Sequence, residues 1–401
     1  MNKAGLKLLI QCGALMLAFG HLASMVSAQT AIAEDAFAKQ QRELSAKNPD
    51  HFTFKLKLRD DKTQFHRGEK IHLELSFASS SPNSYFIDNA GYDRSGRLSM
   101  DTFVIDRPDG ATDPLYDYYH KSIGGFMMGG LRGNPALGPK PEKIDYDLNE
   151  WLRFEKPGKY RLYVVSPRVN GGKPYHAGSK PLVAVSNIIE FEILAADRNW
   201  EETTLNSAKA LLNNPPKPDY YRAESERRAA CRTLRFLGTD AAVKEIIERF
   251  RGQDEECDFD YYLGVIGAPN PTTAIELMES ALEAPAHPVA HSFLSALIFL
   301  DYIRQHPEAY IEFGADEAGQ KAARAQWATR KANFDLIRND CVARLANAIA
   351  QKRGAAAAIS IETLLSYQQG DQSKDAAARR QQMAVALAKV AENASLVADS
   401  P

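Results

Sequence analysis

The amino-acid sequence predicts a protein of two parts, an antiparallel β-sandwich followed by an α-helical domain. Residues 51–196 contain short stretches in which apolar and polar residues alternate, the period of a half-buried strand. Turn signals such as Pro157-Gly158 and Pro108-Asp109-Gly110 separate these stretches. From residue 197 onward the apolar residues recur at helical spacing instead. Short strands with one polar face are typical of an antiparallel sandwich rather than a parallel α/β sheet.

The composition sets broad limits on the class of protein. The chain has 401 residues, of which 44% are hydrophobic, enough for two or three domains with ordinary cores. The formal net charge of −2 does not indicate nucleic acid or an anionic membrane as a partner. The sequence contains neither a G-x-S-x-G elbow nor a C-x-x-C pair. No cofactor is therefore predicted, and enzymatic activity is left open with a non-enzymatic protein favoured.

The first 28 residues predict export. Lys3 and Lys7 precede an apolar run over 8–19, and Val26-Ser27-Ala28 resembles a cleavage site for signal peptidase. We expect cleavage after Ala28 and a periplasmic or extracellular protein. No stretch approaches about 18 consecutive apolar residues, so no transmembrane anchor is expected. Residues 29–50 predict a short helix or a tether.

The strands expected between residues 51 and 196 share the alternating pattern. They cover 52–58, 71–77, 98–105, 152–154, 160–165 and 187–194. Tyr160 opens the alternation that follows the Pro157-Gly158 turn. This arrangement resembles the E–F corner of immunoglobulin-like sandwiches, in which a Tyr near the start of strand F bonds back across the corner. The resemblance implies a tyrosine corner at Tyr160; an ordinary hairpin is the alternative.

A long insertion interrupts the β part at 113–143. It carries Tyr116, Tyr118, Tyr119 and Phe126 among several glycines and prolines. A loop of this length inside a sandwich is uncommon, and such loops are usually functional or disordered. The aromatic rings could form a ligand surface and stack on sugar rings, or they could fold onto the end of the sandwich.

The helical part shows a repeating unit. Gly238 and Gly267 each end a predicted helix, and each is followed by a helix-capping signal, Thr239 or Asp240 in the first case and Asn270-Pro271 in the second. Helix–turn–helix units with a period near thirty residues indicate a helical solenoid. The sequence from Leu237 to Val243, LGTDAAV, resembles the helix turn of HEAT-like repeats. The resemblance covers about 220–305 and implies stacked helical pairs.

Three cysteines remain after removal of the signal segment: Cys231, Cys257 and Cys341. Aligning the two glycines places Cys231 less than one helical turn from the level of Cys257. If neighbouring helices pack side by side, a disulfide between these two residues is geometrically feasible in an exported protein. Small apolar cysteines packed between helices are the alternative.

No metal site is predicted. His287 and His291 have the i, i+4 spacing of two zinc ligands, but Pro288 places His287 at a helix cap. The acidic run 254–260 lacks the alternating order of a calcium loop.

These features predict an exported, non-enzymatic binding or scaffold protein that engages a protein partner in the cell envelope. The concave face of the helices and the 113–143 insertion are the expected contact surfaces. A carbohydrate-binding module using Tyr116, Tyr118, Tyr119 and Phe126 is the alternative. A hydrolase with its site at the junction of the two parts is a further one. Resemblance of fold alone does not decide among them.

Overall fold

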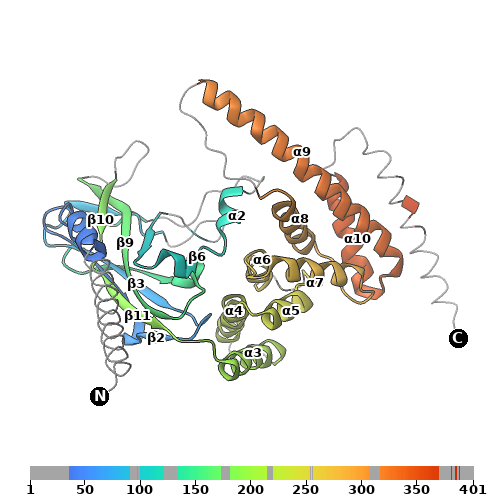
Figure 1. Cartoon of the computed structure of the whole chain (residues 1–401), viewed down its shortest axis with the longest axis horizontal. Coiled ribbons are helices and arrows are strands. Elements are labelled where there is room, and N and C mark those ends of the chain that lie inside the picture. The colour runs from blue at the N-terminus through green and yellow to red at the C-terminus, as the bar shows by residue number, and fades with distance from the viewer. Residues whose placement is uncertain are drawn as a thin grey trace, which may run out of the picture.

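The computed structural model describes residues 36–369 except 91–96, 98–99, 122–132, 173–180, 215–219, 253, 255 and 308–316, together with 381, 384, 385 and 388. The predicted signal segment and Phe126 lie outside the described residues. Figure 1 shows the strands gathered at one end of the molecule and the long helices at the other. A β-rich first part and a helical second part are thus confirmed.

Two sheets form the β part. Sheet A is antiparallel, in the order β1 (Phe52–Leu58), β3 (His72–Ser79), β7 (Glu142–Asp147). Sheet B is built on the long strand β9 (Gly158–Gly171), in the order β10 (Leu182–Val185), β9, β11 (Ile189–Ile193), β2 (Gln64–Phe65). Strands β4 (Tyr85–Ile87) and β5 (Thr102–Ile105) also pair with β9. A short ladder joins β6 (Ala111–Thr112) to β8 (Arg153–Phe154). Among the described ladders only β11–β2 is parallel.

The two sheets share one hydrophobic core, which explains the alternation in the sequence. Along β3 every second side chain is buried, and Leu75 is fully inaccessible to solvent. Sheet B contributes Leu162, Val164 and Phe191 to the same core. Because successive side chains of a strand point to opposite faces, this register places one apolar face of each sheet inward.

The N-terminal segment packs on the β part rather than hanging free as a tether. Residues 36–45 are helical, and the Phe37 ring lies 5.1 Å from that of Tyr163 on β9. The Asn48 amide accepts from the Val185 N–H at 2.7 Å and donates to the Val185 carbonyl at 2.8 Å. Asn187 makes the same pair of hydrogen bonds with the backbone of Leu56 on β1: it accepts from the N–H at 2.9 Å and donates to the carbonyl at 3.0 Å. Two amide side chains therefore form hydrogen bonds with backbone N–H and C=O groups on an outer strand of each sheet.

The helices of the second part stack in two layers. They are α3 (Arg198–Asn213), α4 (Tyr220–Leu237), α5 (Asp240–Arg249), α6 (Asp258–Ile266), α7 (Pro271–Glu283), α8 (His291–Gln305), α9 (Glu317–Ala348) and α10 (Gly354–Gln369). Helices α4, α6 and α8 pack side by side, and α5, α7 and α9 form the second layer. The expected caps are present, since Thr239 Oγ1 accepts from the Ala242 N–H and Asn270 Oδ1 from the Thr273 N–H.

Candidate binding site

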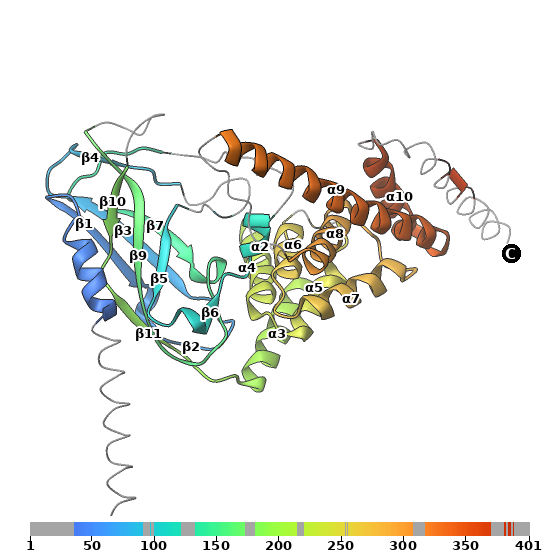
Figure 2. The ribbon, with the colours of Figure 1, turned by 45° about the horizontal axis from the view of Figure 1, so that its top comes forward.

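The tyrosines of the insertion lie on a short helix, α2 (Tyr116–Lys121), placed between the β part and the helices (Figure 2). The Tyr118 ring meets those of Tyr262 on α6 and Phe299 on α8 edge-on, at centroid distances of 5.7 and 5.9 Å. The Tyr119 ring lies 4.3 Å from the Arg97 guanidinium. Tyr116 stacks on His120 and is 47% exposed. The described tyrosines therefore do not form one open surface, because Tyr118 is part of the contact between the two parts.

Arg97 fixes the base of the insertion. Its side chain is 3% exposed and donates to both carboxylate oxygens of Asp113 at 2.8 Å. A further bond reaches the Glu150 carbonyl at 2.8 Å. Sequence reasoning missed this arginine because its partners are 16 and 53 residues away.

Charged side chains join the two parts at a second place. The Arg235 side chain on α4 is 5% exposed and forms ion pairs with Glu150 and with Asp260 on α6. Burial alone lowers the pKa of an arginine, but the charges of Glu150 and Asp260 outweigh burial and raise the pKa of Arg235. Since two carboxylates hold it, this guanidinium stays charged although it is buried.

Asp147 extends this network to sheet A. Its carboxylate lies 2.6 Å from His72 Nδ1 and 3.2 Å from the Arg232 guanidinium on α4. Burial raises the pKa of Asp147. The hydrogen bond from His72 and the charges of Lys70, His72 and Arg232 together lower it by more, so the pKa lies below its usual value. Asp147 is therefore held ionised where β7 ends against α4.

The junction is closely packed between these charges. Gly68 has φ of +80°, and a Cβ there would lie 2.9 Å from the Leu237 backbone at the end of α4. Arg153 donates to the Gly267 carbonyl at 2.6 Å. The cavity between the parts measures about 30 Å³, room for one or two water molecules, whereas ligand pockets typically measure 300 Å³ or more. The cavity thus suits ordered water rather than a substrate.

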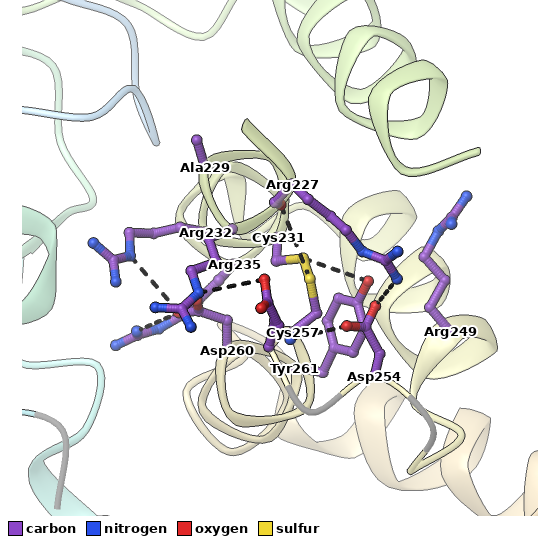
Figure 3. Close-up of a disulfide and its surroundings, with 12 residues drawn as sticks. Arg227, Ala229, Cys231, Arg232, Arg235, Arg249, Asp254, Cys257, Asp260 and Tyr261 are labelled. Carbon is purple, nitrogen blue, oxygen red and sulfur yellow. Dashed lines mark hydrogen bonds and ion pairs between the residues drawn. A yellow bond between two sulfur atoms is a disulfide. The ribbon is translucent and has the colours of Figure 1, made fainter. Parts of the chain in front are cut away.

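A disulfide links two neighbouring helices of the layer formed by α4, α6 and α8, which faces the β part and which we call the inner layer (Figure 3). Cys231 on α4 is bonded to Cys257, the residue before α6, with Cα atoms 5.7 Å apart. Both residues are inaccessible to solvent. Cys341 is a free, buried thiol, and burial raises its pKa to about 12. The pair that the sequence singled out is the pair that the structure joins.

Two open grooves of ligand size lie on the surface. The first, which we call the helical groove, has a volume of about 410 Å³ and is lined by Asn213, Arg227, Glu245, Glu248, Arg249, Arg251, Asp254 and Tyr261. The second, the sheet groove, has a volume of about 630 Å³ and is lined by Thr63, Gln64, Asp106, Arg107, Lys159, Tyr160, Arg161, Glu190, Phe191 and Glu192. Sequence reasoning found neither groove, because each brings together residues distant along the chain.

The two histidines at zinc-ligand spacing, His287 and His291, contact different partners. His287 Nε2 lies 2.9 Å from the Ile247 carbonyl, and the His291 ring stacks on Tyr367. Within the described residues, no group of three or more His, Cys, Asp or Glu side chains is arranged to hold a metal ion. The same part of the chain has no helix long and apolar enough to cross a membrane.

Comparison of the chain with protein-family models, with curated proteins and with solved structures finds no match.

Proposed function

We propose that this chain is an exported, non-enzymatic binding protein that engages a protein partner in the cell envelope or outside the cell. The observation that carries the proposal is the buried Arg235 network, which ties Glu150 of the β part to α4 and α6. Breaking a buried ion pair is costly, so the two parts move together and present one rigid surface. A rigid surface with open grooves suits recognition of another molecule.

We propose further that the β part is immunoglobulin-like. The strands on either side of the Pro157-Gly158 turn pair with different neighbours, β8 with β6 and β9 with β11, which argues against a simple hairpin. The Tyr160 hydroxyl, fully buried, lies 2.6 Å from the Lys156 carbonyl, a bond to the backbone a few residues upstream as in a tyrosine corner. A Cβ at Gly110 would overlap this hydroxyl, so the corner needs a glycine there.

The stacked helical pairs support a HEAT-like solenoid in the same proposal. Their inner layer is not free for a partner along its length, however. Arg232 and Arg235 of α4 contact the β part, and Tyr262 and Phe299 contact α2. We therefore assign partner binding to the two open grooves rather than to the concave face of the helices.

Photo-crosslinking from defined positions tests this assignment. The crosslinking residue p-benzoylphenylalanine would replace Glu248 in the helical groove or Glu190 in the sheet groove, with exposed Arg42 as the control position. We expect a crosslinked protein from one groove position that disappears when excess unmodified protein competes. Absence of any competed product from either groove, or equal products from Arg42, would refute the proposal.

Export has its own test. Sequencing the N-terminus of protein recovered from the envelope or medium should give Gln29. Recovery of the uncleaved chain from the cytoplasm alone would contradict export.

Carbohydrate binding is the second candidate, and the exposed ring of Tyr116 is what favours it. Sugar rings stack on exposed aromatic faces. A glycan array would then show binding that Tyr116→Ala abolishes, with Phe in place of Tyr116 restoring it. Binding that is indifferent to Tyr116→Ala would exclude this ring as the sugar platform.

A further inference from the structure

The floor of the helical groove holds a hydroxyl with a poor partner. Tyr261 is 1% exposed, and its hydroxyl lies 3.6 Å from Cys231 Sγ. A disulfide sulfur carries no hydrogen, so the hydroxyl must donate in this contact, and sulfur is a weak acceptor. Buried tyrosine hydroxyls usually reach a stronger acceptor. Tyr261 therefore offers a proton donor to whatever enters the groove.

A second donor lies beside it. Arg227 pairs with Asp254 through one terminal nitrogen, while its Nε is buried and has no hydrogen-bond partner among the described residues. Figure 3 shows the Arg227 guanidinium, the Tyr261 hydroxyl and the Arg249 side chain on the same side of the disulfide. Unmatched buried donors of this kind call for water or a ligand acceptor.

One cation of the groove is available to an anionic acceptor. The carboxylates of the groove already have cationic neighbours: Asp254 pairs with Arg227, and Glu245 with both Arg249 and Lys209. Glu248 lies 4.0 Å from Lys244. Arg251 donates from Nε to the Glu248 carbonyl, and within the described residues its guanidinium has no carboxylate partner. The lining thus holds three arginines and three carboxylates, and Arg251 is the arginine among them with no carboxylate partner in the described part of the chain.

We propose that the helical groove binds carboxylate side chains, so that the partner presents an acidic segment to this face. This inference rests on the proposed partner-binding function and gives the chemistry of the partner. A carboxylate has two acceptor oxygens, which can take bonds from the Tyr261 hydroxyl and the Arg227 Nε while Arg251 supplies the opposite charge. The groove volume of about 410 Å³ accommodates one or two such side chains.

Peptide binding to the mature protein tests the chemistry directly. The probe is a fluorescent, N-acetylated and C-amidated peptide of four glutamates flanked by glycines, with a four-glutamine peptide as the matched control. We expect the glutamate peptide to bind at least about tenfold more tightly than the glutamine peptide, since charge-assisted hydrogen bonds are the stronger ones.

Variants locate the binding. Tyr261→Phe removes only the hydroxyl, and Arg251→Gln removes the unpaired charge; each should weaken the glutamate peptide by about tenfold. Arg42→Gln removes the same charge from the exposed N-terminal helix and should leave affinity unchanged. A thermal unfolding scan of each variant establishes that it is folded. Equal binding of both peptides, or wild-type affinity in folded Tyr261→Phe and Arg251→Gln, would overturn the proposal.

Loss of the carboxylate assignment and loss of partner binding give different experimental results. If a protein still crosslinks specifically from position 248 while these variants bind the peptide as well as wild type does, the carboxylate assignment is wrong and partner binding stands. If no groove position gives a competed product, the proposed function itself is wrong.

Discussion

Arg235 on helix α4 and Glu150, just before β8, form an ion pair across the junction of the two parts, and the arginine side chain is only 5% exposed. Asp260 holds the same guanidinium from α6 at 3.0 Å. Burial of a charge is tolerated only where partners compensate it, so this contact is fixed in geometry.

Replacing Arg235 should therefore destabilise the protein strongly. Arg235→Met leaves Glu150 without its cation and Asp260 with only Arg232, 3.9 Å away, and we expect a loss of about 3 kcal/mol in the free energy of unfolding. Urea denaturation of Arg235→Met, Glu150→Met and the double variant should show a coupling of at least about 1 kcal/mol. Lys331→Met, which breaks the exposed pair with Asp335, is the control and should change stability by less than about 1 kcal/mol. Additive effects of Arg235 and Glu150 would contradict the pairing.

Gly68 should not tolerate a side chain. Gly68→Ala combines a left-handed φ of +80° with overlap against the Leu237 backbone, and we expect a cost of about 2 kcal/mol or more. Gly172→Ala is a matched control, because Gly172 has φ of +71° but open space around it, and should cost about 1 kcal/mol. Equal losses of thermal stability in the two variants would mean that α4 does not approach Gly68 closely.

The disulfide predicts how many thiols of the denatured protein will react. Mature protein, denatured without reductant, should show one reactive thiol, that of Cys341, and three after reduction. Because the bridge closes a loop with a sequence separation of 26, Cys231→Ala/Cys257→Ala should lose about 3 kcal/mol of stability. Cys341→Ala should abolish the thiol signal and leave the bridge intact. Three thiols without reduction would rule the bridge out.

Stability should fall in mild acid because of His287. Burial lowers the pKa of this imidazole in the folded protein, and the charges of Lys352 and Arg251 lower it further, against an ordinary value of 6.5. Below pH 6.5 the unfolded chain therefore takes up a proton that the folded chain resists. Stability from this group is full above pH 6.5 and declines as the pH drops toward the folded-state pKa.

The measurement is the urea midpoint between pH 7.5 and 5. His287→Gln should flatten the acid decline relative to wild type, although its absolute stability is lower, since the bond to the Ile247 carbonyl is altered. His51→Asn, at an exposed position, is the control and should keep the wild-type slope. An unchanged slope in His287→Gln would assign the decline to other groups.

Local patterns allowed much of the fold to be predicted from the sequence. Alternation located β1 and β3 because each buries one face, and capping signals located the starts of α5 and α7 because they satisfy free backbone N–H groups. The strands β2, β4, β6, β7 and β10 were missed, as were the ends of β9. Strand β2 has only two residues, and β9 runs on through Pro167 to Gly171, where its apolar alternation is interrupted.

The candidate site was less predictable for a physical reason. Helical spacing, a local quantity, showed that a bridge between Cys231 and Cys257 was feasible, and the structure contains it. The partners of Tyr118 are 144 and 181 residues away, at Tyr262 and Phe299, and no periodicity encodes such contacts. The helical groove likewise needs α3, α4, α5 and α6 in place before its lining residues meet.

The amide side chains of Asn48 and Asn187 have a consequence for self-association. Outer strands with free backbone groups recruit other chains and seed aggregates. Asn48 occupies one such site on β10 and Asn187 one on β1, while Lys55 and Lys57 project from β1 into solvent. A chain shortened to begin at residue 51 would retain both sheets but uncover Val185. The N-terminal helix and Asn48 thus cover an outer strand that would otherwise be open to pairing with another chain.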